Sequence, residues 1–409
     1  MTVLPALISQ HFQTDRGPLG VAVSGGSDSL ALLHLMADWG GAPLRCVTVD
    51  HRLRAASGPE AAQVAAICAS LGIAHDTLTW DGWDGRGNLA ATARAARYAL
   101  MAAWAHEHGL SGVALGHTRD DVAETLLMRL ARRAGVDGLA AMPARRREGG
   151  VTLHRPLLAA GRGELRAYLE ARGATWIDDP SNSDGRYRRT LARRALTALE
   201  PVGISAQALA DVAAHMAEAR GTLGHYAAQE ARALVAVQHG DLLMPADAFA
   251  RLRPDIARRI LSAGLRWITG AGYGARGPDL DRLLAAIASG RGGTLGGCHV
   301  SLSGNTLRVA REFAAVRHCT AAPGTPWDGR WDLNGPHLPD AELRALGAEG
   351  RAACPAWRET GLPAQSVQTL PAVWQGDTLI AAPLAGDANG WTARLRRDAT
   401  DLQAMLLSH

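Results

Sequence analysis

Short apolar runs alternate with amphipathic patterns of helical period over the first half of the chain. Strand-like runs cover 21–23, 44–49, 73–80, 112–116 and 151–154, and helical patterns cover 30–39, 60–71, 88–108, 120–134 and 164–172. Strands that alternate with helices build βαβ units, in which helices cover both faces of a parallel sheet. The pattern therefore predicts an α/β fold with a doubly wound parallel sheet.

The alternation stops near residue 198, and the pattern then changes. Helical patterns dominate from 205 to about 288, a hairpin is expected over 299–311, and a second strand pair is expected over 372–381. We therefore predict three domains: an α/β domain over 1–200, a helical domain over 201–315 that ends in a hairpin, and a small mixed or β-rich domain over 316–409.

Arginine alone carries the positive charge of this chain. The 409 residues include 43 basic side chains, none of them lysine, against 39 acidic ones, and the excess lies within residues 1–199. Two runs stand out: Arg129, Arg132, Arg133, Arg145, Arg146 and Arg147, and then Arg186, Arg188, Arg189, Arg193 and Arg194. Such runs are typical either of solvated helix faces or of an interface with the RNA backbone.

Cysteine usage and hydropathy bear on the compartment. The five cysteines are scattered without a C-x-x-C pair, and their odd number favours reduced thiols. No uncharged apolar stretch is long enough to span a bilayer, and the first residues lack a basic leader. We expect a cytoplasmic protein without a membrane partner.

The segment Ser24-Gly25-Gly26-Ser27-Asp28-Ser29 joins the first strand to the first long helix. A glycine turn at the start of a helix gathers backbone N–H groups and the positive helix end, which makes an anion site suited to phosphate. A kinase-type P-loop is excluded because it needs lysine. A nucleophile elbow would need a glycine at position 29 and an earlier strand. A purely structural turn stays an alternative.

A second polar cluster follows the fourth strand, at Gly116-His117-Thr118-Arg119-Asp120-Asp121 and Glu124. Thr118 and Asp121 form a capping-box pattern, which explains part of it. Three acids with a histidine at a strand's carboxyl end also suit Mg²⁺ or an amine. Asp28, inside an anion site, is expected to face a cation or to accept N–H bonds within the turn.

Other candidates are less specific. Asp50 ends the second strand, where it could contact a ribose or close a turn. Arg94 and Arg97 lie on one helix face, either as surface residues or as a phosphate clamp. The segment 178–182 is either a turn or a substrate loop. His106 and His108 resemble a metal-ligand pair next to a helix end.

Taken in order, these motifs resemble the tRNA(Ile)-lysidine synthase family of N-type ATP pyrophosphatases, whose loop is written S-G-G-x-D-S. The resemblance rests on the segments 24–29, 50–54, 93–98, 116–125, 155–158 and 176–182, covers residues 20–195 strongly, and continues weakly to the C-terminus. Thr190 departs from the asparagine usual in the family, which leaves an RNA contact at that position open.

The resemblance implies an adenine-nucleotide alpha-hydrolase-like fold and a two-step ligation. ATP would adenylate the wobble cytidine of an isoleucine tRNA with a CAU anticodon, and free L-lysine would then displace AMP to give lysidine, so that AUA is read instead of AUG. It implies Mg²⁺ on Asp28 and Asp121, and catalytic roles for Asp28, His117, Asp121 and Glu124. Nucleotide contacts are expected at Ser24, Gly25, Gly26, Ser27, Asp28, Ser29, Asp50 and Arg97, and RNA contacts at Arg188, Arg189 and Arg193.

Three rivals share part of this pattern. A tRNA cytidine 2-thiolation enzyme has the same loop but would need cysteine pairs, which the chain lacks. GMP synthetase and asparagine synthetase also use the loop, but they explain neither the arginine runs nor residues 178–182. A non-catalytic RNA-binding protein on a degenerate nucleotide fold is the rival from another class.

Overall fold

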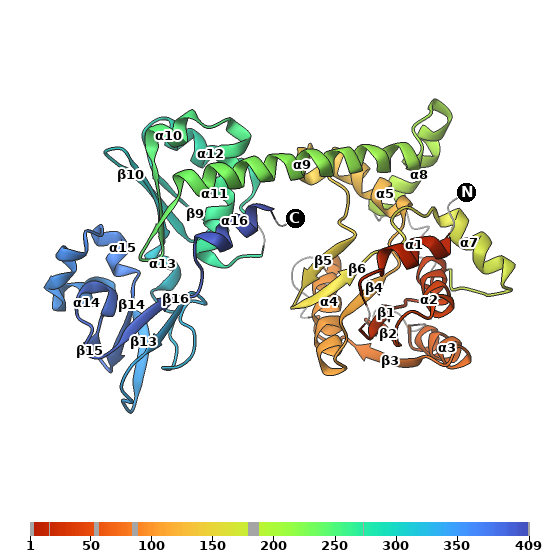
Figure 1. The fold of residues 1–409 in the computed structure, drawn as a ribbon, viewed down its shortest axis with the longest axis horizontal. Coiled ribbons are helices and arrows are strands. Elements are labelled where there is room, and N and C mark those ends of the chain that lie inside the picture. Colours follow the sequence, from red (N-terminus) through yellow and green to blue (C-terminus); the bar gives the residue numbers. More distant parts are fainter. Residues whose placement is uncertain are drawn as a thin grey trace. The chain divides into compact units, whose positions relative to one another are not determined.

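The computed structural model describes residues 4–15, 17–52, 57–83, 89–178, 188–272 and 274–407. The chain divides into two units, residues 1–220 and 221–409, and each is described by itself. Figure 1 labels the helices and strands of both.

A six-stranded sheet organises the first unit, in the order β3-β2-β1-β4-β6-β5. Its strands are β1 (Leu19–Ala22), β2 (Leu44–Asp50), β3 (Ala74–Thr79), β4 (Gly112–Leu115), β5 (Arg145–Glu148) and β6 (Val151–His154). All neighbours pair in parallel except β5, which pairs with β6 in the antiparallel sense at one edge. The predicted parallel sheet is confirmed.

Helices cover both faces of this sheet, as Figure 1 shows. On one face lie α1 (Leu4–His11), α2 (Ser27–Trp39), α3 (Ser57–Ser70) and α7 (Arg162–Ala171), which share a buried cluster with Leu19 and Val21. On the other face α4 (Leu89–Glu107) packs its Met101 and Trp104 against Val113 and Leu153. The predicted double winding is confirmed.

A smaller helical group completes the first unit. It comprises α5 (Arg119–Leu130), α6 (Val136–Leu139), α8 (Arg188–Leu199), the 3₁₀ turn η2 (Glu200–Val202) and the start of α9 (Ala206–Leu234). Val122 and Leu126 of α5 share a buried cluster with Leu209 and Ala213 of α9. This cluster holds α5, and with it the residues that follow β4, in place.

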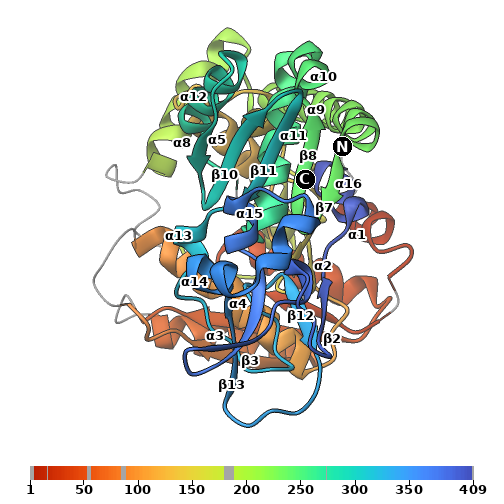
Figure 2. The same ribbon diagram turned by 90° about the vertical axis from the view of Figure 1, so that its left-hand side faces the viewer.

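A five-stranded antiparallel sheet, in the order β7-β8-β11-β10-β9, lies at the centre of the second unit. Its strands are β7 (Ala236–Gln238), β8 (Asp241–Pro245), β9 (Gly293–Leu295), β10 (Cys298–Ser303) and β11 (Thr306–Arg311). The predicted hairpin is confirmed as β10 and β11, which lie side by side in Figure 2. The β7–β8 hairpin was not predicted, because its short apolar strands lie between long helical patterns.

Helices pack on this sheet and bury Trp267, Leu261 and Val300 in one cluster. They are α10 (Ala246–Arg251), α11 (Pro254–Thr269), α12 (Gly277–Ala288) and the C-terminal α16 (Ala399–Leu407). Both Leu402 and Leu406 of α16 belong to that cluster. The C-terminal end of the chain therefore returns to the core of the helical region.

The remaining part of the second unit is built from short elements. They are α13 (Phe313–Val316), β12 (Trp331–Asn334), β13 (Ala341–Ala345), α14 (Gly347–Ala353), η3 (Pro355–Thr360), α15 (Ala364–Gln368), β14 (Pro371–Gln375), β15 (Thr378–Ala381), η4 (Pro383–Ala385) and β16 (Thr392–Leu395). The predicted second strand pair is confirmed as β14 and β15. The division into three domains stays a prediction.

Across the described ranges, no helix combines the length and the apolar character needed to cross a bilayer.

Candidate active site at the carboxyl edge of the parallel sheet

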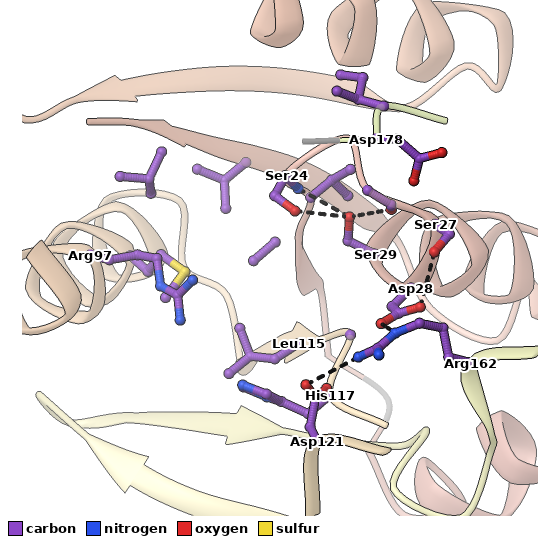
Figure 3. A pocket seen from close by; sticks show the side chains of 18 of the residues that line it. Ser24, Ser27, Asp28, Ser29, Arg97, Leu115, His117, Asp121, Arg162 and Asp178 are labelled. Atoms are coloured by element: carbon purple, nitrogen blue, oxygen red, sulfur yellow. Dashed lines mark hydrogen bonds and ion pairs between the residues drawn. The ribbon is translucent and has the colours of Figure 1, made fainter. Parts of the chain in front are cut away.

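The site lies where the strand order changes direction. From β1 the chain builds outward through β2 and β3, and it then returns to place β4 on the other side of β1. Loops after β1 and β4 therefore diverge, which opens a crevice at the carboxyl ends of the strands. A cavity of about 390 Å³ occupies this position and is lined from both loops, as Figure 3 shows.

The loop after β1 is held in one conformation by its own groups. Gly25 has a φ of 85°, and its carbonyl accepts a 2.9 Å hydrogen bond from the Ile177 N–H. A Cβ on Gly25 would lie 2.4 Å from Ile177 Cδ1, so this position requires glycine. The Ser29 hydroxyl donates to the Gly26 carbonyl at 2.9 Å and accepts from the Ser24 N–H at 3.2 Å.

The start of α2 leaves its first amides available. Gly26 precedes the helix in extended conformation, and no side chain caps it. The first N–H groups of any helix have no partner within the helix, and the helix dipole makes that end positive. Because Gly26, Ser27 and Ser29 line the cavity, this end of α2 is the anion site predicted from the sequence.

Gly116 brings the two loops together. A Cβ there would lie 2.9 Å from Ser29 Cα and 3.0 Å from the Asp28 carbonyl carbon and oxygen, all of them backbone atoms. We expect Gly116→Ala to displace the start of α2 and to lower kcat/KM for ATP by about 100-fold, since a shift of 1 Å can have an effect of this size. Steady-state kinetics with varied ATP measures it.

The matched control is Gly135→Ala, where a Cβ meets no heavy atom within 4 Å. It should leave kcat/KM unchanged. If Gly116→Ala behaves like this control, the two loops do not cooperate in nucleotide binding.

One arginine joins all three predicted carboxylates. Arg162, at the start of α7, donates from Nε to Asp28 Oδ2 at 3.0 Å and from Nη1 to Glu124 Oε1 at 3.2 Å. Its Nη2 lies 3.5 Å from Asp121 Oδ1. Figure 3 shows Arg162 between Asp28 and Asp121 at one side of the cavity. Three acidic side chains thus surround one guanidinium.

Two arginines of α8 complete this cluster. Arg189 Nε donates to Glu124 Oε2 at 2.8 Å, and Arg193 Nε donates to Glu124 Oε1 at 2.7 Å. The Glu124 side chain is 0% exposed, so it acts on these arginines and not on the cavity. Arg189 and Arg193, predicted to bind RNA, therefore face carboxylates here, whereas Arg188 is exposed on α8. Their RNA contacts stay a prediction.

The charges of the cluster shift one another's titration. Burial raises the pKa of Asp28, and the neighbouring Arg162 offsets part of that effect. Burial would also raise the pKa of Asp121, but Arg189 and the Thr118 N–H together hold it below its usual value. Burial opposes the charge on Arg162, yet Asp28, Glu124 and Asp121 raise its pKa. Arg162 is therefore a permanent cation of the site.

The opposite wall of the cavity is largely apolar with a few polar groups. Val47, Val49, Met101 and Leu115 line it, and Figure 3 shows Arg97 reaching in from α4. Three buried nitrogens on this wall have no partner among the described residues: His51 Nδ1, Arg97 Nε and His117 Nδ1. Unpaired buried polar atoms are rare, and a bound ligand would pair them.

His117 is uncharged at neutral pH. Burial lowers its pKa to about 3, and Arg155, Arg97 and Arg94 add to the effect while Asp121 opposes it. A side chain with this pKa is a weak proton acceptor, so it suits a hydrogen-bonding role better than that of a general base.

The capping box predicted at the start of α5 is confirmed. The Thr118 N–H donates to Asp121 Oδ2 at 2.9 Å, and the Asp121 N–H donates to Thr118 Oγ1 at 3.4 Å. One oxygen of Asp121 therefore caps the helix, while the other faces Arg162 and Arg189.

Other predicted residues lie elsewhere. Asp50 is absent from the cavity lining, and its Oδ1 accepts a 2.8 Å bond from the Arg52 N–H, so it closes a turn while its neighbour His51 lines the cavity. His106 and His108 do not share a ligand position, since His106 contacts the Gly149 carbonyl and His108 lies 3.6 Å from Asp76. Asp178 lines the cavity, whereas 179–182 and Arg186 lie outside the described residues.

Sequence reasoning missed Arg162, His51 and Ile177. The signal for Arg162 was its place: it follows β6 at the same edge of the sheet as the two predicted loops. Ligand-binding residues gather at the carboxyl ends of parallel strands, so the segment after β6 deserved the same weight as the segments after β1 and β4.

Comparisons with known proteins agree with this geometry. A family model described as PP-loop domain matches residues 5–200. The chain is 51% identical to tRNA(Ile)-lysidine synthase of Ruegeria pomeroyi, over 96% of this chain and 94% of that protein. It is 38% identical to the protein of the same name in Bradyrhizobium sp., over 76% of this chain and 91% of that protein. The Wolbachia pipientis protein of that name is 34% identical over 76% of each chain.

Proposed function

The chain belongs to the tRNA(Ile)-lysidine synthase family, and we propose that it ligates free L-lysine to the wobble cytidine of isoleucine tRNA with a CAU anticodon. The C2 oxygen of cytidine attacks the α-phosphorus of ATP, and the bond to pyrophosphate breaks. The ε-amine of lysine then attacks C2, loses a proton, and displaces AMP with the oxygen. The product reads AUA instead of AUG.

The observation that carries this proposal is the open start of α2 at the strand-order switch. Negative charge develops on the departing pyrophosphate, and fixed N–H dipoles stabilise such charge without reorganising. Gly26, Ser27 and Ser29 supply these dipoles at the cavity wall. The loop conformation, held by Ser24, Ser29 and Ile177, keeps them aimed before ATP arrives.

The apolar wall suits the two bases that the reaction brings together. A nucleobase can pack on Val47, Val49 and Met101, while the unpaired nitrogens of Arg97 and His117 hydrogen-bond to its edge or to a phosphate. Sequence-specific proteins read single-stranded bases in this way, by splaying them out of the stack. In this proposal His117 orients a substrate and does not transfer a proton.

The carboxylates suit the ammonium groups of lysine. Asp28 and Asp121 line the cavity and are available to a ligand that competes with Arg162. Glu124 is buried and contacts Arg162, Arg189 and Arg193, so we assign it a positioning role. Lysine binding would then exchange one cation for another at the same oxygens, which limits the desolvation that the acids must undergo.

Mg²⁺ fits this site in one specific mode. The described residues hold no group of three or more metal-ligating side chains. Mg²⁺ in nucleotide sites takes one or two carboxylates together with substrate phosphates and water. Asp28 and Asp121 would be those carboxylates, and the ion would neutralise charge on the triphosphate. A free tRNA substrate also places the reaction in the cytoplasm, where the five cysteines would stay reduced.

Labelled lysine incorporation tests this function. With ATP present, we expect the label to enter isoleucine tRNA with a CAU anticodon, with one AMP and one pyrophosphate released per lysine. Methionine tRNA, whose anticodon is also CAU, should stay unlabelled. Pyrophosphate release without lysine transfer, or equal labelling of both tRNAs, would contradict the proposal.

A further inference from the structure

A second group of arginines surrounds Tyr98 on α4. Arg94 Nη2 donates to the Tyr98 hydroxyl at 2.9 Å, and its Cζ lies 5.1 Å from the ring centroid. The Cζ of Arg97 lies 5.3 Å from the same centroid. Burial would raise the pKa of Tyr98, but Arg94, Arg97 and Arg155 together lower it. Three guanidinium groups thus converge on one buried phenol.

This group continues from the cavity wall to the surface. Arg97 lines the cavity, Arg94 is exposed, and Arg129 and Arg132 follow at the end of α5. Burial lowers the pKa of Arg129, and the positive charges of Arg132 and Arg94 lower it further. Arg129 is held by the carbonyls of Gly138 at 2.7 Å and Ala140 at 3.2 Å.

We call Arg94, Arg97, Arg129, Arg132 and Arg155 the arginine track. Within the described ranges no member forms an ion pair with an acidic side chain, whereas Arg162 and Arg189 each pair with two or more carboxylates. The buried Nε atoms of Arg97 and Arg155 also have no described partner. A concentration of like charge with unpaired buried donors needs an anion to compensate it.

The form of the track indicates which anion this is. One carboxylate is satisfied by one bidentate guanidinium, whereas a nucleic-acid backbone brings a charge with every nucleotide. The track has an inner member at the cavity and outer members at the surface, and a strand that leaves its terminal contact in the cavity would follow the same course.

We propose that the arginine track binds the phosphates of the single-stranded RNA that flanks the nucleotide in the cavity. This inference rests on the proposed function, and it deepens it by naming the surface that holds the RNA. It also assigns the backbone contacts to α4 and α5, in place of the α8 arginines that face Glu124.

The test is the salt dependence of tRNA binding by the double variant Arg94→Gln with Arg132→Gln. The logarithm of the binding constant falls with the logarithm of salt concentration by about 0.7 to 0.9 for each phosphate contact. Losing two contacts should therefore reduce the magnitude of the slope by about 1.5. Dissociation constants for an unmodified CAU isoleucine tRNA transcript, measured at several salt concentrations without ATP or lysine, give the slope.

Arg172→Gln is the matched control, because Arg172 is an exposed arginine that pairs with Asp38 and Tyr168 at the end of α7. It removes a charge of the same size and should leave the slope unchanged. An unchanged slope in the double variant would overturn the proposal. So would a normal slope combined with a raised KM for lysine or for ATP, because the track would then serve a small substrate.

Binding is measured without the ligation reaction, so its outcome is independent of the proposed function. If the wild-type protein binds tRNA with the expected slope but incorporates no lysine, the proposed function fails while the track stands. If lysine is incorporated but the slope does not depend on Arg94 and Arg132, only the track fails.

Discussion

Replacing Asp28 with asparagine is expected to lower kcat for lysine incorporation by at least about 100-fold while the protein stays folded. The amide keeps the shape of the side chain but removes the charge that Arg162 and a substrate cation share. Asp28 lies in the first turn of α2, beside the amides that receive phosphate. Removing a negative charge there should not weaken ATP binding, so kcat should fall without a rise in the KM for ATP.

Asp38→Asn is the matched control for this variant. Asp38 lies on the same helix, at its far end, and pairs with Arg172 and Tyr168 away from the cavity. Steady-state kinetics of both variants, with thermal unfolding as the check on folding, decides the matter. An Asp28→Asn enzyme within about threefold of wild type would remove Asp28 from the reaction, because general acid–base and electrostatic effects are much larger than this.

Replacing Arg162 with methionine is expected to abolish activity and to lower the free energy of unfolding by about 3 to 5 kcal/mol. The change leaves Asp28, Asp121 and Glu124 close together without the cation that joins them. Breaking a buried ion pair by removing one partner is destabilising for this reason. Urea unfolding at neutral pH measures the loss.

The pH dependence of this variant has a definite sign. Without Arg162, the clustered carboxylates should titrate above their unfolded-state values, so the folded state would bind more protons than the unfolded state in that range. Stability relative to wild type should therefore recover as the pH falls from 8 toward 5. Arg172→Met, which removes an exposed arginine of the same segment, should change stability by less than about 1 kcal/mol at both pH values. A loss for Arg162→Met that does not depend on pH would mean that the carboxylates are compensated in another way.

Much of the first unit could be predicted because its elements follow a simple rule. The helix predicted at 60–71 is α3 (Ser57–Ser70), and the strand predicted at 44–49 is β2 (Leu44–Asp50). Each buries one stripe or both faces, and such burial leaves a period in the sequence. The edge strand β5 (Arg145–Glu148) leaves none, because it reads as four charged residues and gains its structure only by pairing with β6.

The candidate site divides in the same way. The loop at 24–29 and the capping box at Thr118 are local, so their residue types alone indicate their conformation. The role of Arg162 is not local: it depends on α2, α5 and α7 meeting at one edge of the sheet. The inward direction of Arg189 and Arg193 depends on the packing of α8 against α5, which no charge count reveals.

The central claim is that the amides at the start of α2 receive the phosphates of ATP. A crystal structure of the Asp28→Asn variant with ATP tests it most directly, because slow turnover preserves the bound nucleotide. We expect the triphosphate to lie within hydrogen-bonding distance of the backbone N–H groups of Gly26, Ser27 and Ser29, with the adenosine toward Val47 and Met101. Triphosphate bound elsewhere on the chain, with these amides hydrated, would contradict the account.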